Sequence, residues 1–223
     1  MRRISKALPP KRQTVLFSAT LTRDVERIAD EYVTDPVRVS VTPEKPVLDS
    51  IHQEVCFVAQ ENKMPLLQAY LRGQGDRGGI HSTIVFCRTK YGCEKLSKQL
   101  NKHGFRSDAI HGDKSQGARQ RALNSFRSGK LPVLIATDVA ARGIDVRSIS
   151  MVINYDIPEA ADSYVHRIGR TARAEAEGNA VTFCTVKDVG LLAQIEKFIG
   201  KNHEGCDNHY LGNNPNVPGN TMA

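Results

Sequence analysis

The 223-residue chain lacks the Gly-x-x-x-x-Gly-Lys-Ser/Thr loop with which many ATPases hold nucleotide phosphates. The nearest sequence, Gly129-Lys130-Leu131, has the wrong third residue and no preceding glycine frame. No apolar run approaches the roughly 18 residues that a membrane-spanning helix needs, and the basic N-terminus lacks the apolar core of a signal peptide. These absences exclude a self-contained phosphate-loop ATPase, and we expect no membrane partner.

Cysteine is scarce, and its spacing excludes the common redox and zinc pairs. The five cysteines form no Cys-x-x-Cys, and three of them lie in apolar runs that are typical of buried strands, namely Cys56, Cys87 and Cys184. We therefore expect reduced thiols and a cytoplasmic protein. His203, Cys206 and His209 are spaced like metal ligands, but structural zinc takes four ligands, so we predict no metal site.

Positive charge is in excess over negative charge. The 31 lysines and arginines outnumber the 24 aspartates and glutamates, which gives a net charge of +7. Such an excess favours a polyanionic partner, either a nucleic acid or an anionic membrane surface.

From residue 49 onward, apolar runs of strand length alternate with helical patterns. The predicted strands are Ile51–Val58, Thr83–Phe86, Ser107–Ile110, Val133–Ala136, Met151–Asn154 and Ala180–Thr185. The predicted helices are Lys63–Arg72, Tyr91–His103, Gln116–Ser128, Ala161–Ile168 and Val189–Ile199. Continuously apolar strands with helices between them indicate a doubly wound α/β fold, in which a parallel sheet has helices on both faces.

The N-terminal part of the chain has a pattern of its own. Residues 15–17 and 37–41 are predicted as strands, and residues 21–33 have the apolar spacing of a helix. We therefore expect residues 1–42 to be a separate piece of folded chain.

Two further segments are predicted from composition. Two prolines and two opposite charges mark an interdomain linker at residues 43–48. Residues 201–223 are rich in Asn, Gly and Pro and are predicted to form a disordered tail. The domain between them spans residues 49–200.

Polar residues follow the ends of several predicted strands. Arg88-Thr89, Gly112 and Thr137-Asp138 each come just past an apolar run. Because ligands of doubly wound sheets bind at the carboxyl ends of the strands, we expect these residues to share one edge. A threonine after a strand is also a common helix cap, and that alternative stays open for Thr89.

Five motifs occur in the order and spacing of one protein family. They are Ser18-Ala19-Thr20 and residues 84–89, 111–119, 136–145 and 166–173, the last reading His-Arg-Ile-Gly-Arg-Thr-Ala-Arg. Over residues 11–200 the chain resembles the DEAD-box RNA helicases, and the wording of two segments is nearest to the bacterial RhlE-like branch. The resemblance implies a RecA-like fold and, in the intact protein, ATP-dependent unwinding of RNA duplexes with ATP and Mg²⁺ as cofactors.

The resemblance assigns contacts with the RNA backbone to Thr89, Gly112, Gln116, Arg119 and Thr137. Hydroxyls, an amide, a guanidinium and helix N-termini suit sequence-independent contacts with sugars and phosphates. For Gln116 and Arg119 the alternative is an ordinary first helical turn, although an arginine there opposes the helix dipole.

The resemblance also assigns residues to ATP. Arg170 and Arg173 match the arginine fingers, which stabilise the charge on a transferred phosphoryl group. Gly143 and Asp145 match nucleotide-binding positions, with the carboxylate accepting from the ribose hydroxyls. The alternatives are a solvated basic helix end for the two arginines and an ordinary turn residue for Asp145.

A last group resembles residues that join two RecA-like domains across a cleft. The group consists of Ser18, Thr20, Arg142 and His166, and for His166 a buried, hydrogen-bonded histidine is the alternative. The Asp-Glu-Ala-Asp motif and the phosphate loop, which hold most of the ATP and Mg²⁺ in this family, are absent.

The chain therefore resembles the end of a first RecA-like domain joined to a whole second one. The implied partners are RNA, ATP and the first domain of the same protein. Two other functions stay open. One is a stand-alone RNA-binding or chaperone module that does not use ATP, and the other is a DNA helicase of the wider superfamily.

Overall fold

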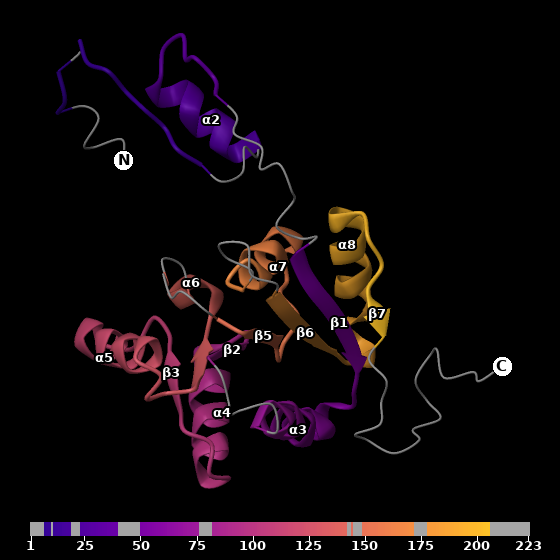
Figure 1. Ribbon diagram of the computed structural model, residues 1–223. Helices are drawn as coiled ribbons and strands as arrows, with labels where there is room; N and C mark the ends of the chain where they lie inside the picture. The colour runs from indigo at the N-terminus through magenta and orange to yellow at the C-terminus, as the bar shows by residue number, and fades with distance from the viewer. Residues whose placement is uncertain are drawn as a thin grey trace. The chain divides into compact units, whose positions relative to one another are not determined.

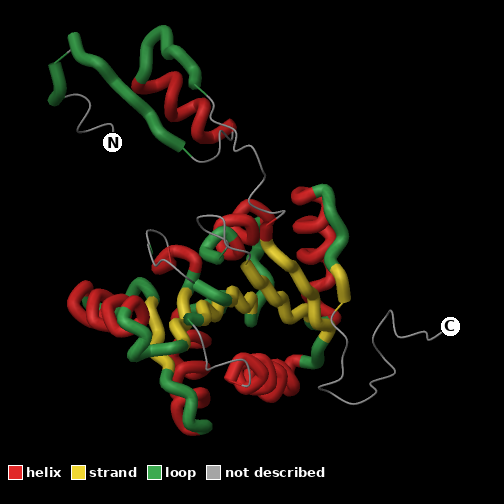
Figure 2. Tube along the Cα trace, viewed as in Figure 1, coloured by secondary structure: helices red, strands yellow, loops and turns green. Residues whose placement is uncertain are grey.

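Figure 1 shows the computed structural model of the chain, and Figure 2 shows its secondary structure. The structure describes residues 7–9, 11–18, 23–39, 50–75, 82–141, 144, 149–171 and 178–205. The chain divides into two compact units, residues 1–43 and 44–223. Within the described ranges, no helix is long and apolar enough to cross a membrane.

The first unit contains helix α2 (Arg23–Tyr32) but no strand in its described residues. The strand prediction for residues 15–17 was wrong, and so was the described part, 37–39, of the strand predicted at residues 37–41; residues 40–41 lie outside the described residues. Phe17 is 92% exposed and Val37 is 90% exposed. An extended segment becomes a stable strand only when a neighbour pairs with its backbone and covers its apolar side chains. The described part of the first unit shows no such pairing for these segments.

The second unit is built on a parallel sheet of seven strands. The strands are β1 (Ile51–Phe57), β2 (Thr83–Phe86), β3 (Ser107–Ile110), β4 (Val133–Ala136), β5 (Met151–Asn154), β6 (Gly178–Cys184) and β7 (Glu204–Gly205). Their order across the sheet is β3-β4-β2-β5-β6-β1-β7, and every pair is parallel. The six predicted strands are confirmed, with small differences at the ends of β1 and β6.

Helices cover both faces of this sheet (Figure 1). They are α3 (Lys63–Gly75), α4 (Lys90–Lys102), α5 (Gln116–Arg127), α6 (Asp138–Ala141), α7 (Ala161–Ile168) and α8 (Val189–Ile199), with the short 3-10 helices η2 (Gln60–Asn62) and η3 (Val186–Asp188). Buried side chains of α3 and α4 pack on one face, and those of α5, α6, α7 and α8 pack on the other. The predicted doubly wound fold with helices on both faces is confirmed.

Residues 201–205, expected to begin a disordered tail, are ordered, and the last two of them, β7 (Glu204–Gly205), extend the sheet. β7 pairs with β1 in parallel. The buried His203 ring joins α7 to α8, because its Nε2 is 2.7 Å from Tyr164 Oη and its Nδ1 is 3.2 Å from Glu196 Oε1. Burial lowers the pKa of His203, although Glu196 opposes this shift. Cys206 and His209, considered with His203 as metal ligands, lie outside the described residues.

The cysteines only partly follow expectation. Cys87, Cys93 and Cys184 are buried free thiols, and a hydrogen bond with Cys93 together with burial raises the pKa of Cys87 well above its usual value. Cys56, which we expected to be reduced, is disulfide-bonded.

Candidate functional site

The carboxyl ends of four neighbouring strands are level with one another. In the register of the sheet, Ile110 is opposite Ala136, Ala136 is opposite Phe86, and Phe86 is opposite Asn154. These are the last residues of β3, β4, β2 and β5. The segments that follow therefore leave the sheet side by side, and the prediction that they share one edge is confirmed.

Helix α4 begins at this edge, directly after β2. Thr89 is its N-cap, because Thr89 Oγ1 accepts a hydrogen bond from the Gly92 N–H at 3.0 Å. The helix-cap alternative for Thr89 is therefore confirmed, and a cap does not exclude a contact with a ligand. A hydroxyl has one proton and two lone pairs, and the cap uses one lone pair. The proton and the second lone pair are left for a ligand.

The loop between β3 and α5, residues 111–115, is tied to α4 by charged groups. The buried His111 has its Nε2 2.9 Å from Glu94 Oε1, and Lys114 Nζ is 2.9 Å from the same oxygen. These hydrogen bonds hold the pKa of Glu94 below its usual value. The loop is thereby fixed with Gly112 exposed, and a Cβ built on Gly112 would meet no heavy atom within 4 Å.

Helix α5 presents the next two predicted RNA contacts. Ser115 caps the helix by accepting from the Ala118 N–H at 3.3 Å, and Gln116, the first helical residue, is exposed. Arg119 turns toward α6, where its Nη2 donates to the Ala140 carbonyl at 3.4 Å, while its buried Nε has no hydrogen-bond partner. Arg119 therefore links α5 to α6 and does more than occupy a first helical turn.

Thr137 lies between the end of β4 and the start of the short helix α6. It is half-buried, and its carbonyl accepts from the Ala141 N–H at 2.9 Å. The adjacent Asp138 binds Arg167 on α7, which is not among the predicted site residues. The Arg167 Nε is 2.6 Å from Asp138 Oδ1, and its Nη2 is 2.8 Å from Oδ2. The pair is bidentate, which is the strongest geometry between a guanidinium and a carboxylate.

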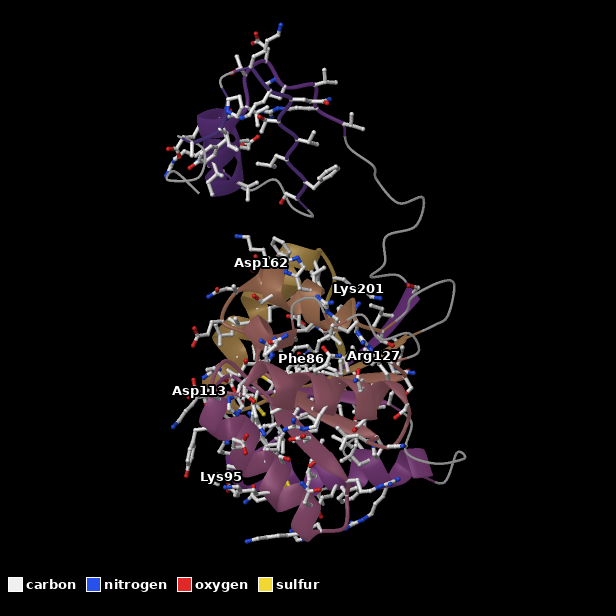
Figure 3. All side chains as sticks on the ribbon, turned by 90° about the vertical axis from the view of Figure 1, so that its left-hand side faces the viewer. Phe86, Lys95, Asp113, Arg127, Asp162 and Lys201 are labelled. Atoms are coloured by element: carbon white, nitrogen blue, oxygen red, sulfur yellow. The ribbon has the colours of Figure 1, made fainter. Side chains whose placement is uncertain are left out.

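Arg167 is 2% exposed, and all three nitrogens of its guanidinium donate hydrogen bonds. Its Nη1 donates to the Asp156 carbonyl at 2.6 Å and to Asn154 Oδ1 at 3.3 Å. The guanidinium carbon lies 5.0 Å from the centre of the Phe86 ring. Phe86, which Figure 3 labels, is buried in the interior of the unit. Arg167 thus joins α7 to the ends of β2, β4 and β5.

The predicted coupling residue His166 and the predicted arginine finger Arg170 lie on either side of Arg167 in the sequence. His166 is exposed, so the buried-histidine alternative is wrong. Arg170 lies in the turn after α7, where its Nε and Nη1 donate to the carbonyls of His166 and Ile144, both at 3.2 Å. The next residue, Thr171, is buried and donates to the Ile149 carbonyl at 2.7 Å. Because an anionic phosphate oxygen is a stronger acceptor than a neutral carbonyl, it can displace these contacts of Arg170.

The remaining predicted site residues cannot be placed at this edge. Ser18 is exposed in the first unit. Five others lie outside the described residues: Thr20, Arg142, Gly143, Asp145 and Arg173.

A second charged network supports the edge from the side of β5 and β6. The buried Lys63 donates to Asp156 Oδ1 at 3.2 Å, and Asp156 Oδ2 accepts from the Arg88 N–H at 3.1 Å. Arg88 Nη2 also donates to Asp188 Oδ1 at 3.4 Å. Burial would raise the pKa of Asp188, but Thr185, Lys63 and Arg88 together hold it below its usual value.

The donors at this edge suit phosphates and sugars more than bases. They are a hydroxyl on each of two segments, an amide, guanidinium groups and the N-termini of α4 and α5. Within the described ranges, no group of three His, Cys, Asp or Glu side chains could hold a metal ion. A phosphate backbone is therefore the ligand that this chemistry fits.

Comparison with known proteins decides the family. Residues 62–175 match the helicase conserved C-terminal domain. The chain is 43% identical over 197 residues to the ATP-dependent RNA helicase DbpA of Bacillus subtilis and 43% identical over 201 residues to DEAD-box ATP-dependent RNA helicase 40 of Oryza sativa. The chain belongs to the DEAD-box family of ATP-dependent RNA helicases. The alignments cover 88% and 89% of this DEAD-box chain but 40% and 25% of the two relatives.

Solved DEAD-box structures share its fold. Saccharomyces cerevisiae Dbp5 bound to RNA and ADP BeF3 matches with a TM-score of 0.79 and 32% identity, over 92% of this chain and 54% of that one. Escherichia coli SrmB bound to the regulator RraA matches with a TM-score of 0.66 and 35% identity, over 70% of this chain and 91% of that one. The sheet and helices of the second unit therefore form a RecA-like fold.

Two buried cations of this DEAD-box chain were missed from the sequence. Arg167 could have been found, because it is spaced with Tyr164 and Ile168 on the buried face of α7 and so had to be an interior charge. Lys63, at the start of α3, gave no such signal, because its partners Tyr155 and Asp156 follow β5, far away in the sequence.

Gly112→Ala separates a structural role of this glycine from a ligand-binding role. The structure leaves open space at this position, so the melting temperature should not change. The affinity for single-stranded RNA should fall, because a methyl group would stand where an RNA backbone approaches. Thermal denaturation and fluorescence anisotropy measure the two effects. Gly104→Ala is the matched control, since its φ of +85° makes alanine strained and should lower the melting temperature alone. Unchanged RNA affinity in Gly112→Ala would remove Gly112 from the site.

Proposed function

We propose that this chain is the RNA-binding and arginine-finger part of an ATP-dependent RNA helicase that locally unwinds RNA duplexes. In this proposal residues 1–42 are the end of a first RecA-like domain and residues 43–48 are the linker. Residues 49–200, extended by β7 (Glu204–Gly205), are the second RecA-like domain. The observation that carries the proposal is the level edge at the ends of β2, β3, β4 and β5, where phosphate-binding donors emerge beside an arginine of the finger motif.

The RNA side of the proposal comprises Thr89, Gly112, Gln116, Arg119 and Thr137. Their groups contact sugars and phosphates and read no base edges, so binding is independent of sequence. The yeast Dbp5 structure that the chain matches contains RNA, which supports this assignment.

The ATP side comprises Arg170 and Arg173 as fingers and Gly143 and Asp145 as nucleotide contacts. In phosphoryl transfer, charge develops on the oxygens of the transferred group, and a guanidinium placed there stabilises the transition state. The proposal leaves the phosphates and Mg²⁺ mainly to the first domain, because the chain has neither a phosphate loop nor an Asp-Glu-Ala-Asp motif. The ADP BeF3 in the Dbp5 structure supports a nucleotide at this kind of domain.

Closure of the two domains couples ATP to RNA in this proposal. Ser18 and Thr20 act from the first domain, and Arg142 and His166 act from the second. The exposure of His166 supports its role, since a coupling side chain has to reach outward. We also propose action in the cytoplasm, where RNA and ATP are at hand, and membership of the bacterial RhlE-like branch, which the wording of residues 110–123 and 164–174 supports.

Binding to the RNA backbone predicts a defined response to salt. Short single-stranded RNAs of unrelated sequence should bind weakly and alike, and more weakly as potassium chloride rises. Arg119→Ala should weaken all of them equally and lower the slope of log affinity against log salt by about 0.7 for one lost phosphate contact. Gln116→Ala should weaken binding without changing the slope, because the amide is neutral. Fluorescence anisotropy titrations measure both quantities. A strong preference for one sequence, or a slope of zero, would contradict backbone binding.

The division of labour between domains predicts that this chain alone has no RNA-stimulated ATPase activity. In the two-domain enzyme, Arg170→Ala should lower kcat by about 10³–10⁵-fold at saturating RNA, because the finger stabilises the transition state more than bound ATP. Arg170→Lys should rescue poorly, since an ammonium does not reproduce a planar fork. Arg106→Ala, an exposed arginine before β3, is the control and should leave kcat unchanged. Near-normal turnover in Arg170→Ala would show that Arg170 is an ordinary basic residue at a helix end and not a finger. A two-domain protein that binds RNA without hydrolysing ATP would favour the stand-alone RNA-binding module.

A further inference from the structure

An exposed ion pair spans two of the proposed RNA-binding elements. Lys90, the first residue of α4, has its Nζ 2.6 Å from Oδ2 of Asp113 in the β3–α5 loop. Both side chains are largely exposed, at 62% and 60%, and Figure 3 shows Asp113 at the surface of the unit. The Lys90 hydrogen bond holds the pKa of Asp113 below its usual value. The carboxylate is therefore charged at neutral pH.

The position of this pair ties it to the proposed RNA path. Lys90 directly follows Thr89, and Asp113 directly follows Gly112. Gln116 opens the next helix. A phosphate that lay between the start of α4 and the start of α5 would be close to both charges, attracted by the ammonium and repelled by the carboxylate.

The pair is not needed to hold the loop in place. A separate, more buried set of contacts already does so, because Glu94 on α4 binds both His111 and Lys114, and Lys114 also reaches Asp108 at 3.3 Å. The side chains of His111 and Lys114 are 8% and 24% exposed, far less than those of the outer pair. The pair of Lys90 and Asp113 therefore contributes little to the position of the loop, and each side chain can exchange its partner for a ligand.

We propose that Lys90 is a further phosphate-binding residue of the RNA site and that Asp113 competes with RNA for it. This inference rests on the proposed RNA-binding function. In the RNA-free state Asp113 neutralises Lys90. When RNA binds, a phosphate oxygen takes the place of the Asp113 carboxylate, and the carboxylate turns to solvent.

The exchange of the carboxylate for a phosphate costs little free energy. Exposed ion pairs stabilise a protein very little, since side-chain entropy and solvent screening offset most of the attraction. A phosphate displaces the carboxylate at small cost, but the residual repulsion keeps the affinity below what Lys90 alone would give. An intramolecular competitor of this kind suits a helicase, which has to release one strand before it binds the next.

A double-mutant cycle on RNA affinity tests the exchange with the whole chain. The probe is a short fluorescein-labelled oligouridine, titrated at several potassium chloride concentrations. Lys90→Ala should weaken binding and lower the salt slope by about 0.7, the value for one phosphate contact on a single strand. Asp113→Asn should tighten binding by about two- to fivefold, the range that the strength of an exposed ion pair allows. In the Lys90→Ala background, Asp113→Asn should lose most of this gain.

Controls separate this inference from the function on which it rests. Lys102→Ala removes an exposed lysine in the last turn of the same helix, about 18 Å from Lys90 at 1.5 Å per residue, and should leave the salt slope unchanged. Gln116→Ala and Arg119→Ala report on the RNA site itself. If they weaken binding while Lys90→Ala does not, the exchange is refuted and the RNA site stands. If none of these variants changes binding, both the exchange and the proposed RNA site are wrong. An equal gain from Asp113→Asn with and without Lys90 would show simple repulsion and would also refute the exchange.

Discussion

The pair between the buried Arg167 and the half-buried Asp138 is the interaction on which the rest of the site depends. Removing a guanidinium from water costs several kcal/mol, of order 5, unless its donors are paired, and here they bind a carboxylate, a carbonyl and an amide oxygen while the ring of Phe86 covers one face. The pair fixes α7 against the end of β4. Thr137 precedes Asp138, and Arg170 follows Arg167 by one turn, so one ion pair sets the positions of a proposed RNA contact and a proposed arginine finger.

Charged groups at this edge divide into two classes by their exposure. Buried or half-buried pairs, such as Lys63 with Asp156 and His111 with Glu94, join elements that are distant in sequence and hold the edge still. An exposed group binds weakly to a partner that a ligand can replace, as Lys90 does with the carboxylate of Asp113. The buried pairs thus hold the elements of the site in fixed positions, and the exposed groups can exchange their present partners for a ligand. Pre-organised electrostatic stabilisation requires this arrangement.

The sequence predicts the sheet of the second unit well for a physical reason. Strands buried on both faces are continuously apolar, as in residues 133–136, and their ends are marked by polar residues that the site then uses. Prediction fails where tertiary contacts decide. Glu204 and Gly205 follow a polar segment yet pair with β1, and among the described residues the apolar Phe17 and Val37 belong to no strand. The partners of the buried Lys63 lie about 90 residues or more away in the sequence, so no local pattern indicates them.

Arg167 and Asp138 stabilise the fold as a coupled pair, so that neither charge contributes without the other. The most direct measurement is the free energy of unfolding in urea for the chain with Arg167→Met, with Asp138→Asn and with both. Each single change should destabilise the chain by about 3 kcal/mol, the low end for a broken buried pair, because Asp138 is 36% exposed. The double variant should be little worse than either single one, since neither charge is then left unpaired. Losses that simply add, or single losses below about 1 kcal/mol as for an exposed pair, would contradict the account.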